Sequence, residues 1–151
     1  MKVAIGSDHA GFRLKEAIAA HLREQGHEVI DVGTDSEASV DYPVFGAAVG
    51  RTVAEGRAER GIAVCGSGQG ILMAANKIPG IRAGLVRENL DAEMIRRHNN
   101  ANIATFGERF TAPEIALPAV DVFLTTAFEG GRHERRVTEL AELDQPADAS
   151  H

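Results

Sequence analysis

The sequence predicts an α/β domain in which one parallel sheet of five strands is covered by helices on both faces. Five short apolar runs alternate with segments whose apolar residues recur at helical spacing. Alternation of this kind is typical of βαβ units with right-handed crossovers, which build parallel sheets. The length of 151 residues fits a single domain with a substantial core.

The first part of the chain alternates strand, helix, strand and helix. Apolar residues at helical spacing between positions 12 and 22 predict the first helix, and Gly26 suits its end. Asp41 can cap a second helix, with Pro43 in its first turn, which runs to about Gly56. The strands predicted in this part cover residues 2–6, 28–32 and 61–65.

The second part continues the same alternation. The sequence from Thr111 to Glu114 has a capping-box pattern and opens a helix toward Phe128, in which Pro118 implies a kink or a late start. We expect one domain over residues 1–143, followed by a flexible tail over 144–151. The other predicted elements are helices at 71–77 and 89–99, strands at 82–86 and 102–106, and an additional C-terminal helix at 133–143.

The composition narrows the classes of function. Acidic residues outnumber basic ones by 22 to 16, for a net charge of −6, which argues against a nucleic-acid partner but not against a small anion. The single cysteine, Cys65, excludes an internal disulfide and a multi-cysteine metal site. No apolar run approaches the roughly 20 residues of a membrane span, and the first residues show no signal-peptide pattern. We therefore expect a cytoplasmic protein without a membrane partner.

Polar and ionisable residues are concentrated in the turns that follow the predicted strands. Residues 6–11 follow the first strand, residues 65–70 follow the third, and residues 107–109 follow the fifth. His98 and Asn99 end the helix between the fourth and fifth strands, and we expect them at the same edge. Ligands of such sheets bind at the carboxyl ends of the strands.

Residues 66–70 form the most specific feature. Three glycines in five residues, between a strand and a helix, let backbone N–H groups approach an anionic ligand. The G-x-G-x-G spacing does not match the dinucleotide fingerprint, and the turn at 6–11 lacks the Lys-Ser/Thr of a P-loop. A lone cysteine such as Cys65 is often only a small buried hydrophobe, but a helix start favours a thiolate, which could act as base or nucleophile.

Three arginines near the C-terminus stand out in an acidic chain. Arg132, Arg135 and Arg136 lie within five residues, and Arg132 and Arg136 share one helix face. Guanidinium groups suit bidentate binding of phosphate, and Arg109 could join the same anion site. The alternative is a solvated basic face paired with the nearby glutamates.

Seven motifs lie in order along the chain: GSDHAG at 6–11, DYP at 41–43, CGSGQG at 65–70, AANK at 74–77, RHNN at 97–100, FG at 106–107 and EGGRH at 129–133. With these motifs the chain resembles the type B ribose-5-phosphate isomerases, in the family that includes allose-6-phosphate and galactose-6-phosphate isomerases. The resemblance implies a Rossmann-like three-layer sandwich with a five-stranded parallel sheet. It also implies a homodimer, possibly a tetramer, with active sites at the subunit interface and no metal or organic cofactor.

The resemblance assigns catalytic roles to four residues. Cys65 matches the base that moves a proton between C1 and C2 as ribose 5-phosphate and ribulose 5-phosphate interconvert through a cis-enediolate. His98 matches the residue that assists opening of the furanose ring. Ser67 stands where relatives often carry threonine, and Asn99 matches a group that stabilises the enediolate. Another branch of the family uses a glutamate near the place of Ile71, so this sequence looks like the cysteine branch.

The resemblance also assigns residues that bind the substrate. Asp8 and Tyr42 match groups near the ring hydroxyls. The remaining matches are the backbone of Gly66, Gly68 and Gly70 for the enediolate and the side chains of His9, Arg109, Arg132 and Arg136 for the phosphate.

The residues are also compatible with three other functions. The first is isomerisation of another phosphosugar, such as allose 6-phosphate, galactose 6-phosphate or a tetrose phosphate. The second is an enzyme that uses Cys65 and His98 through a covalent intermediate. The third is a non-catalytic module that binds a phosphosugar, although the third strand ends in Cys65 where a receiver domain would carry a phospho-accepting aspartate.

Overall fold

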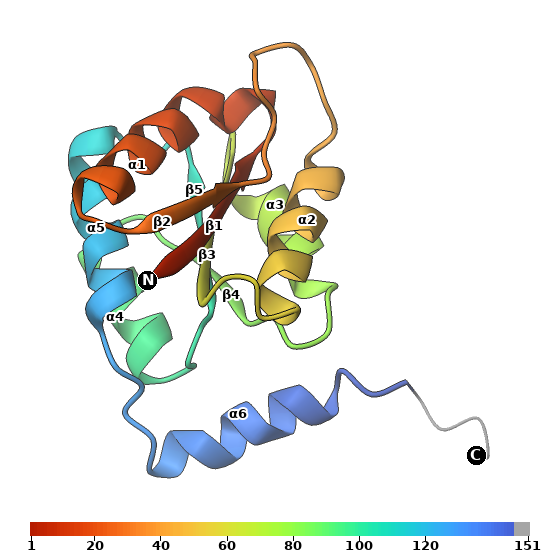
Figure 1. Cartoon of the computed structure of the whole chain (residues 1–151). Helices are drawn as coiled ribbons and strands as arrows, with labels where there is room; N and C mark the ends of the chain where they lie inside the picture. The colour runs from red at the N-terminus through yellow and green to blue at the C-terminus, as the bar shows by residue number, and fades with distance from the viewer. Residues whose placement is uncertain (147–151) are drawn as a thin grey trace.

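The computed structural model describes residues 1–146 and shows one parallel sheet between two layers of helices (Figure 1). The strand order is β2-β1-β3-β5-β4, and every pair of neighbours is parallel. The expected five-stranded parallel sheet is therefore confirmed. The strands are β1 (Lys2–Ser7), β2 (Glu28–Asp31), β3 (Arg60–Cys65), β4 (Ala83–Leu85) and β5 (Ile103–Gly107).

The helices cover both faces of the sheet, and the last one lies apart from both layers (Figure 1). Helices α1, α4 and α5 pack on one face, and α2 and α3 pack on the other. The predicted three layers and additional C-terminal helix are confirmed. The helices are η1 (His9–Gly11, a 3₁₀ turn), α1 (Phe12–Glu24), α2 (Tyr42–Ala54), α3 (Gln69–Asn76), α4 (Asn89–Arg97), α5 (Pro113–Thr125) and α6 (Arg132–Glu142).

The central strand β3 shows how the sequence builds the two cores. Ile62 and Val64 pack with α1 and α5, whereas Ala63 and Cys65 pack with α2 and α3. All four are buried, as expected for a strand covered on both faces, because successive side chains point to opposite sides. Cys65 is thereby placed at the carboxyl end of the sheet, on the side of α3.

The predicted start of α5 differs from the structure, whereas the predicted position of Asp41 before α2 is confirmed. The capping box at Thr111 is wrong: α5 begins at Pro113, and its cap residue is Ala112. The Thr111 N–H is instead donated to the Gly107 carbonyl at 2.9 Å, in a turn that ends β5. Asp41 does precede α2, but its side chain makes no capping hydrogen bond. Pro118 lies inside α5, five residues after the helix begins, so a late start caused by this proline is wrong.

The end of the described chain contacts the body of the protein. The Gly80 N–H donates to the Asp144 carboxylate at 2.8 Å. Residues 147–151 of the predicted tail lie outside the described residues. Across residues 1–146, no helix is long and apolar enough to cross a membrane.

A buried lysine ties α1 to the strand beside it. Lys15 is 1% exposed, and its Nζ donates to an Asp31 carboxylate oxygen at 2.8 Å and to the Thr34 carbonyl at 3.0 Å. Burial disfavours the charged form, but hydrogen bonds to Asp31 and Glu16, with the charges of both, raise the pKa of Lys15 above its ordinary value. The ammonium therefore stays charged while it holds the end of β2.

We expect Lys15→Met to lower the free energy of unfolding by about 2–3 kcal/mol, measured by urea denaturation. Methionine keeps the length of the side chain but leaves the Thr34 carbonyl and the Asp31 carboxylate without their partner. The matched control is Arg13→Met, because Arg13 is 78% exposed where it pairs with Glu37. That change should leave the free energy of unfolding nearly unchanged, because solvent screens the exposed ion pair. Equal losses in the two variants would contradict the role given to Lys15.

Candidate active site

Cys65 lies at the carboxyl edge of the sheet, at the end of β3 between β1 and β5. It is the last residue of β3 and is 4% exposed. The Gly68 N–H donates to its Sγ at 3.2 Å. This hydrogen bond fixes the sulfur within the loop that joins β3 to α3. The thiol and the backbone donors of the loop are therefore parts of one rigid structure.

The loop at 66–70 fits its surroundings so closely that side chains are excluded at two positions. Gly68 has φ 78°, a left-handed conformation, and an added Cβ would lie 2.6 Å from Leu85 and 3.1 Å from the Gly107 nitrogen. At Gly70, an added Cβ would lie 2.8 Å from the Tyr42 ring. The Thr105 hydroxyl donates to the Gly68 carbonyl at 3.0 Å. These contacts hold the loop against β5 and place Tyr42 beside the loop.

The turn after β1 brings a carboxylate and an imidazole to the same edge. One Asp8 oxygen, Oδ1, accepts from the N–H groups of Ala10 and Gly11 at 3.0 and 3.2 Å. Within residues 1–146 the other oxygen, Oδ2, makes no hydrogen bond, although Asp8 is only 6% exposed. His9 Nδ1 lies 3.1 Å from the Val40 nitrogen and 3.2 Å from the Val40 carbonyl oxygen, so the backbone of Val40 holds this ring in place.

The turn after β5 adds a cation beside the glycine-rich loop. The Arg109 N–H donates to the Gly66 carbonyl at 3.1 Å. Its guanidinium passes 3.4 Å from where a Cβ on Gly66 would lie. The neighbouring Glu108 carboxylate accepts from the Leu14 N–H at 2.7 Å and so fixes this turn to the start of α1. Arg109 is thus positioned to attract an anion at this edge.

The expectation that His98 and Asn99 lie at the same edge is wrong for a single chain. A crossover helix runs antiparallel to the strands, so α4 ends at their amino ends. The Gly61 N–H, at the start of β3, donates to the Asn102 carbonyl at 2.9 Å, only four residues after His98. From Gly61 to Cys65 the strand rises roughly 13 Å, at about 3.3 Å per residue. His98 and Cys65 therefore cannot both reach one reacting carbon within a chain, because catalytic groups act at roughly 3 Å.

The arginines of α6 lie at the amino end as well. The Glu129 N–H donates to the Arg97 carbonyl at 3.0 Å, which brings the start of α6, with Arg132, to the end of α4. Arg136 follows one turn later on the same helix. The described structure thus divides the predicted site into a carboxyl-end set (Asp8, His9, Tyr42, Cys65, Gly66, Ser67, Gly68, Gly70, Arg109) and an amino-end set (His98, Asn99, Arg132, Arg136).

Three arginines influence one another at the amino end, and one of them, Arg96, is buried. The pKa of Arg96 is lowered to about 10, first by burial and then by the charges of Arg60 and Arg82. Arg96 donates to the Thr126 and Ala101 carbonyls at 3.0 and 2.6 Å, so it ties α5 to the start of β5. These guanidiniums add to the positive charge of the amino-end set.

Two histidines and a glutamate at the amino end are close enough to be considered as metal ligands. The ligand atoms of His98, Glu129 and His133 lie within 4.8 Å of one another. However, the two imidazole rings are stacked, with centroids 4.3 Å apart and planes at 14°. A metal ion lies in the plane of each imidazole it binds, about 2 Å from the nitrogen. Nearly parallel stacked rings do not meet that condition, so the arrangement does not support a metal site.

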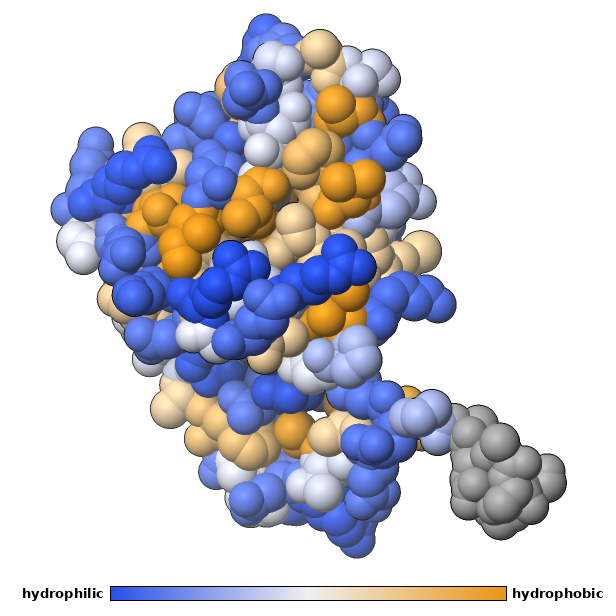
Figure 2. All heavy atoms as spheres, turned by 45° about the vertical axis from the view of Figure 1, so that its right-hand side comes forward, coloured by the Kyte–Doolittle hydropathy of each residue, from blue (hydrophilic) through white to orange (hydrophobic). Residues whose placement is uncertain are grey.

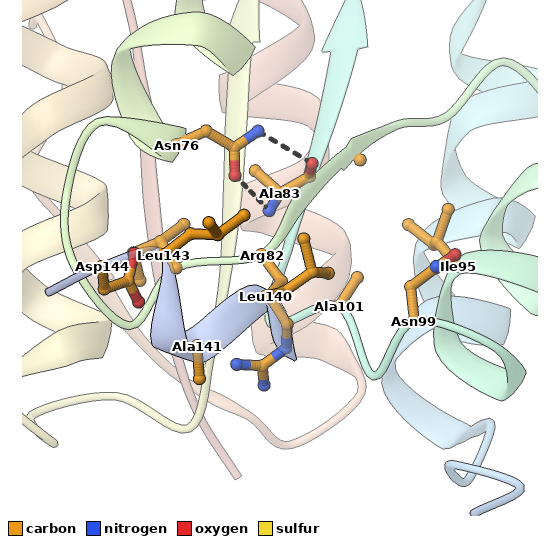
Figure 3. A pocket seen from close by; sticks show the side chains of 12 residues that line it. Asn76, Arg82, Ala83, Ile95, Asn99, Ala101, Leu140, Ala141, Leu143 and Asp144 are labelled. Atoms are coloured by element: carbon orange, nitrogen blue, oxygen red, sulfur yellow. Dashed lines mark hydrogen bonds between the residues drawn. The ribbon is translucent and has the colours of Figure 1, made fainter. Parts of the chain in front are cut away.

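A pocket of about 500 Å³ lies between α6 and the amino end of β4, close to Asn99 (Figure 3). Leu140, Ala141 and Leu143 line it from the side of α6. Arg82 and Asn76 line the opposite side, and Asn76 is fixed by two hydrogen bonds to the backbone of Ala83. The carboxyl-end set does not line this pocket, so the hollow belongs to the amino-end half of the site.

A model of the family described as Ribose/Galactose Isomerase matches residues 3–140 of the chain. The chain belongs to the ribose/galactose isomerase family. The resemblance carried by the seven motifs is thereby confirmed. Solved structures of the family share the fold closely. Ribose-5-Phosphate Isomerase B of Clostridium thermocellum has a TM-score of 0.94 at 49% identity and covers 95% of this chain and 97% of its own. Type B ribose 5-phosphate isomerase of Trypanosoma brucei has a TM-score of 0.90 at 44% identity, covering 94% and 97%.

Named relatives within the ribose/galactose isomerase family match over nearly their whole length. Ribose-5-phosphate isomerase B of Escherichia coli is 46% identical over 144 residues, which are 95% of this chain and 97% of the relative. The protein of the same name from Mycobacterium tuberculosis H37Rv is 43% identical over an alignment of 152 positions that covers 99% of this chain and 93% of the relative.

His133 lies beside His98, a contact that the sequence did not predict. His133 occurs in one of the motifs of the ribose/galactose isomerase family, but no role was expected for it. In the structure it is 7% exposed and stacks on His98. Its position in the first turn of α6, after two glycines, gives no sign of this contact. The contact depends on how α6 returns to α4, which local sequence patterns do not specify.

Proposed function

We propose that this chain is an aldose–ketose isomerase that interconverts ribose 5-phosphate and ribulose 5-phosphate in the pentose phosphate pathway. One observation carries the proposal: a lone thiol faces a loop of backbone donors in a chain that is 46% identical to Escherichia coli ribose-5-phosphate isomerase B over almost all of both lengths. The chemistry needs a base, an acid and hydrogen-bond donors. It requires no metal and no organic cofactor.

The carboxyl-end set supplies the groups for proton transfer. Cys65, as thiolate, takes the proton from C2 of the open-chain aldose and returns it to C1 while a proton passes from O2 to O1, so the thiolate is regenerated at the end of each turnover. The negative charge that develops on O1 is met by N–H groups of the loop at 66–70 and by the Ser67 hydroxyl. The unpartnered Asp8 Oδ2 and the Tyr42 hydroxyl bind the sugar hydroxyls.

The amino-end set completes the site from a second copy of the chain. We infer a homodimer in which His98 and Asn99 of one copy face Cys65 of the other. His98 then serves ring opening, and Asn99 serves the enediolate. His9 and Arg109 on one side, with Arg132 and Arg136 on the other, enclose the phosphate. Phosphate binding far from C1 and C2 provides energy that positions the reacting carbons.

Exposed apolar side chains support self-association. Val44 on α2 and Met73 on α3 are each 62% exposed. Figure 2 shows apolar side chains gathered on the face formed by these helices. On the C-terminal segment, Leu140 and Leu143 are 46% and 80% exposed. Apolar surface of this kind on a single chain is typical of a surface that another chain covers.

The substrate is tested by assaying isomerisation across aldose phosphates of four, five and six carbons. We expect the highest kcat/KM for ribose 5-phosphate. A higher value for a hexose 6-phosphate or a tetrose phosphate would support another phosphosugar isomerase. Saturable binding without turnover of any substrate would support the non-catalytic alternative.

We expect the double variant Arg132→Ala/Arg136→Ala to raise KM for ribose 5-phosphate by about 10²–10⁴-fold and to weaken inhibition by inorganic phosphate to a similar degree. Each guanidinium contributes charge-assisted hydrogen bonds of about 1.5–3 kcal/mol to the phosphate. The matched control is Arg135→Ala on the same helix, because Arg135 is 77% exposed beside Glu139. Unchanged KM and phosphate inhibition in the double variant would remove both arginines from the phosphate site.

A further inference from the structure

The ring of His98 is held by another ring. His98 follows the last residue of α4, and His133 lies in the first turn of α6. Their centroids are 4.3 Å apart and their planes differ by 14°, so the two imidazoles overlap face to face. Within residues 1–146, no hydrogen bond is made by the His98 side chain, and the buried Nε2 of His133 has no partner. The stack is therefore the contact that orients the His98 ring.

The surroundings of His133 keep its ring neutral. Burial, followed by the charges of His98 and Arg132, lowers the pKa of His133; Arg136 acts in the same direction, and the Glu129 carboxylate opposes them. The Glu129 carboxylate lies 3.8 Å from His133 and is already paired with Arg97 at 3.0 Å. A neutral imidazole face can stack on His98 in either of its protonation states, whereas a protonated His133 would repel a protonated His98.

We propose that His133 is a positioning residue: its ring is the platform that holds the His98 imidazole in the orientation needed to open the furanose ring. The inference rests on the proposed function and adds a residue to its ring-opening half. An acid or base is effective when its orientation is fixed by a neighbouring group, and a misplacement of about 1 Å can cost about 10²-fold in rate. Here packing against a ring face takes the place of an orienting hydrogen bond.

The chemistry of the two substrates separates this role from the rest of catalysis. Ribose 5-phosphate is largely a closed furanose and must open before its C2 proton becomes acidic. Ribulose 5-phosphate cannot close a five-membered ring, because its O5 carries the phosphate. Exchange of a C1 proton of ribulose 5-phosphate with solvent therefore needs the thiolate and the enediolate donors but not ring opening. A residue that acts through His98 should affect isomerisation of the aldose and leave this exchange unchanged.

The experiment compares His133→Ala and His133→Phe with the unmodified protein, using Arg135→Ala as control. Two rates are measured: isomerisation of ribose 5-phosphate, and incorporation of deuterium at C1 of ribulose 5-phosphate in D₂O, followed by NMR. We expect His133→Ala to lower kcat for isomerisation by about 10–100-fold while exchange stays within about threefold. Phenylalanine keeps a flat ring face, so His133→Phe should recover most of the lost activity. Arg135→Ala should match the unmodified protein in both rates.

Three outcomes would overturn the inference. Equal losses of isomerisation and exchange in His133→Ala would show that the whole site is disturbed. Full isomerase activity in His133→Ala would show that the stack is dispensable. If His133→Ala does not fold, a His133→Phe protein that folds but remains as slow as a His98→Ala variant would also count against the platform. Absence of both isomerisation and exchange in the unmodified protein would instead overturn the proposed function itself.

Discussion

Cys65→Ala should lower kcat for ribose 5-phosphate by about 10²–10⁴-fold, with KM within about threefold of the unmodified protein. The variant removes the base that moves the proton and leaves the phosphate ligands in place. It should remain folded, because replacing a small buried side chain with alanine costs only about 1 kcal/mol. The measurement is a kinetic assay of isomerisation together with the thermal unfolding midpoint.

Cys65→Ser is the matched variant. Serine keeps a small polar atom that can accept the Gly68 N–H, but its hydroxyl is a far weaker base at neutral pH. Both variants should therefore be similarly slow. A kcat within about threefold of the unmodified protein in Cys65→Ala would remove the cysteine from catalysis. A covalent adduct on Cys65 in quenched, turning-over enzyme would favour covalent catalysis over the enediolate.

Two inactive variants should restore each other's activity when their chains are mixed. A dimer of one Cys65→Ala chain and one His98→Ala chain has one site in which both residues are changed and one in which both are intact. Random pairing makes half of the dimers mixed, so activity should rise to about one quarter of that of the unmodified protein. The measurement follows activity after the two chains are unfolded and refolded together.

A second mixture supplies the control. Cys65 and Arg109 both belong to the carboxyl-end set, so in a mixed dimer of Cys65→Ala and Arg109→Ala each site receives one of the two defects. That mixture should gain no intact site and no activity beyond the mean of its parents. Lack of recovery in the Cys65/His98 mixture, with mixed dimers shown to be present, would contradict the shared site.

The fold was predictable where local patterns decide it. The buried run at 61–65 specifies a central strand because its residues suit burial on both faces. The helix start predicted at Thr111 was wrong. The Thr111 N–H donates to the Gly107 carbonyl in a turn, and this hydrogen bond competes with helix capping. A pattern of residue types cannot show which acceptor a backbone donor finds in three dimensions.

The carboxyl-end half of the candidate site was predictable, and the other half was misplaced. Cys65 and the glycines follow a strand directly, so the direction of the sheet fixes where they lie. His98 ends a crossover helix, and the antiparallel direction of α4 carries it to the far edge. The stack of His98 on His133 depends on the path of residues 126–131, which has no apolar periodicity to reveal it.

In the proposed homodimer, the separation of the two sets along the sheet would make activity depend on the protein concentration. In a folded single chain, Cys65 would lack the acid His98. The arginines of α6 would likewise lack the phosphate ligands of the carboxyl-end set. At concentrations below the dissociation constant of the pair, turnover per chain should fall in proportion to concentration while the folded content is unchanged. Activity would then require the association of two chains. A substitution in the dimer interface would therefore abolish activity even when every residue of the site is unchanged.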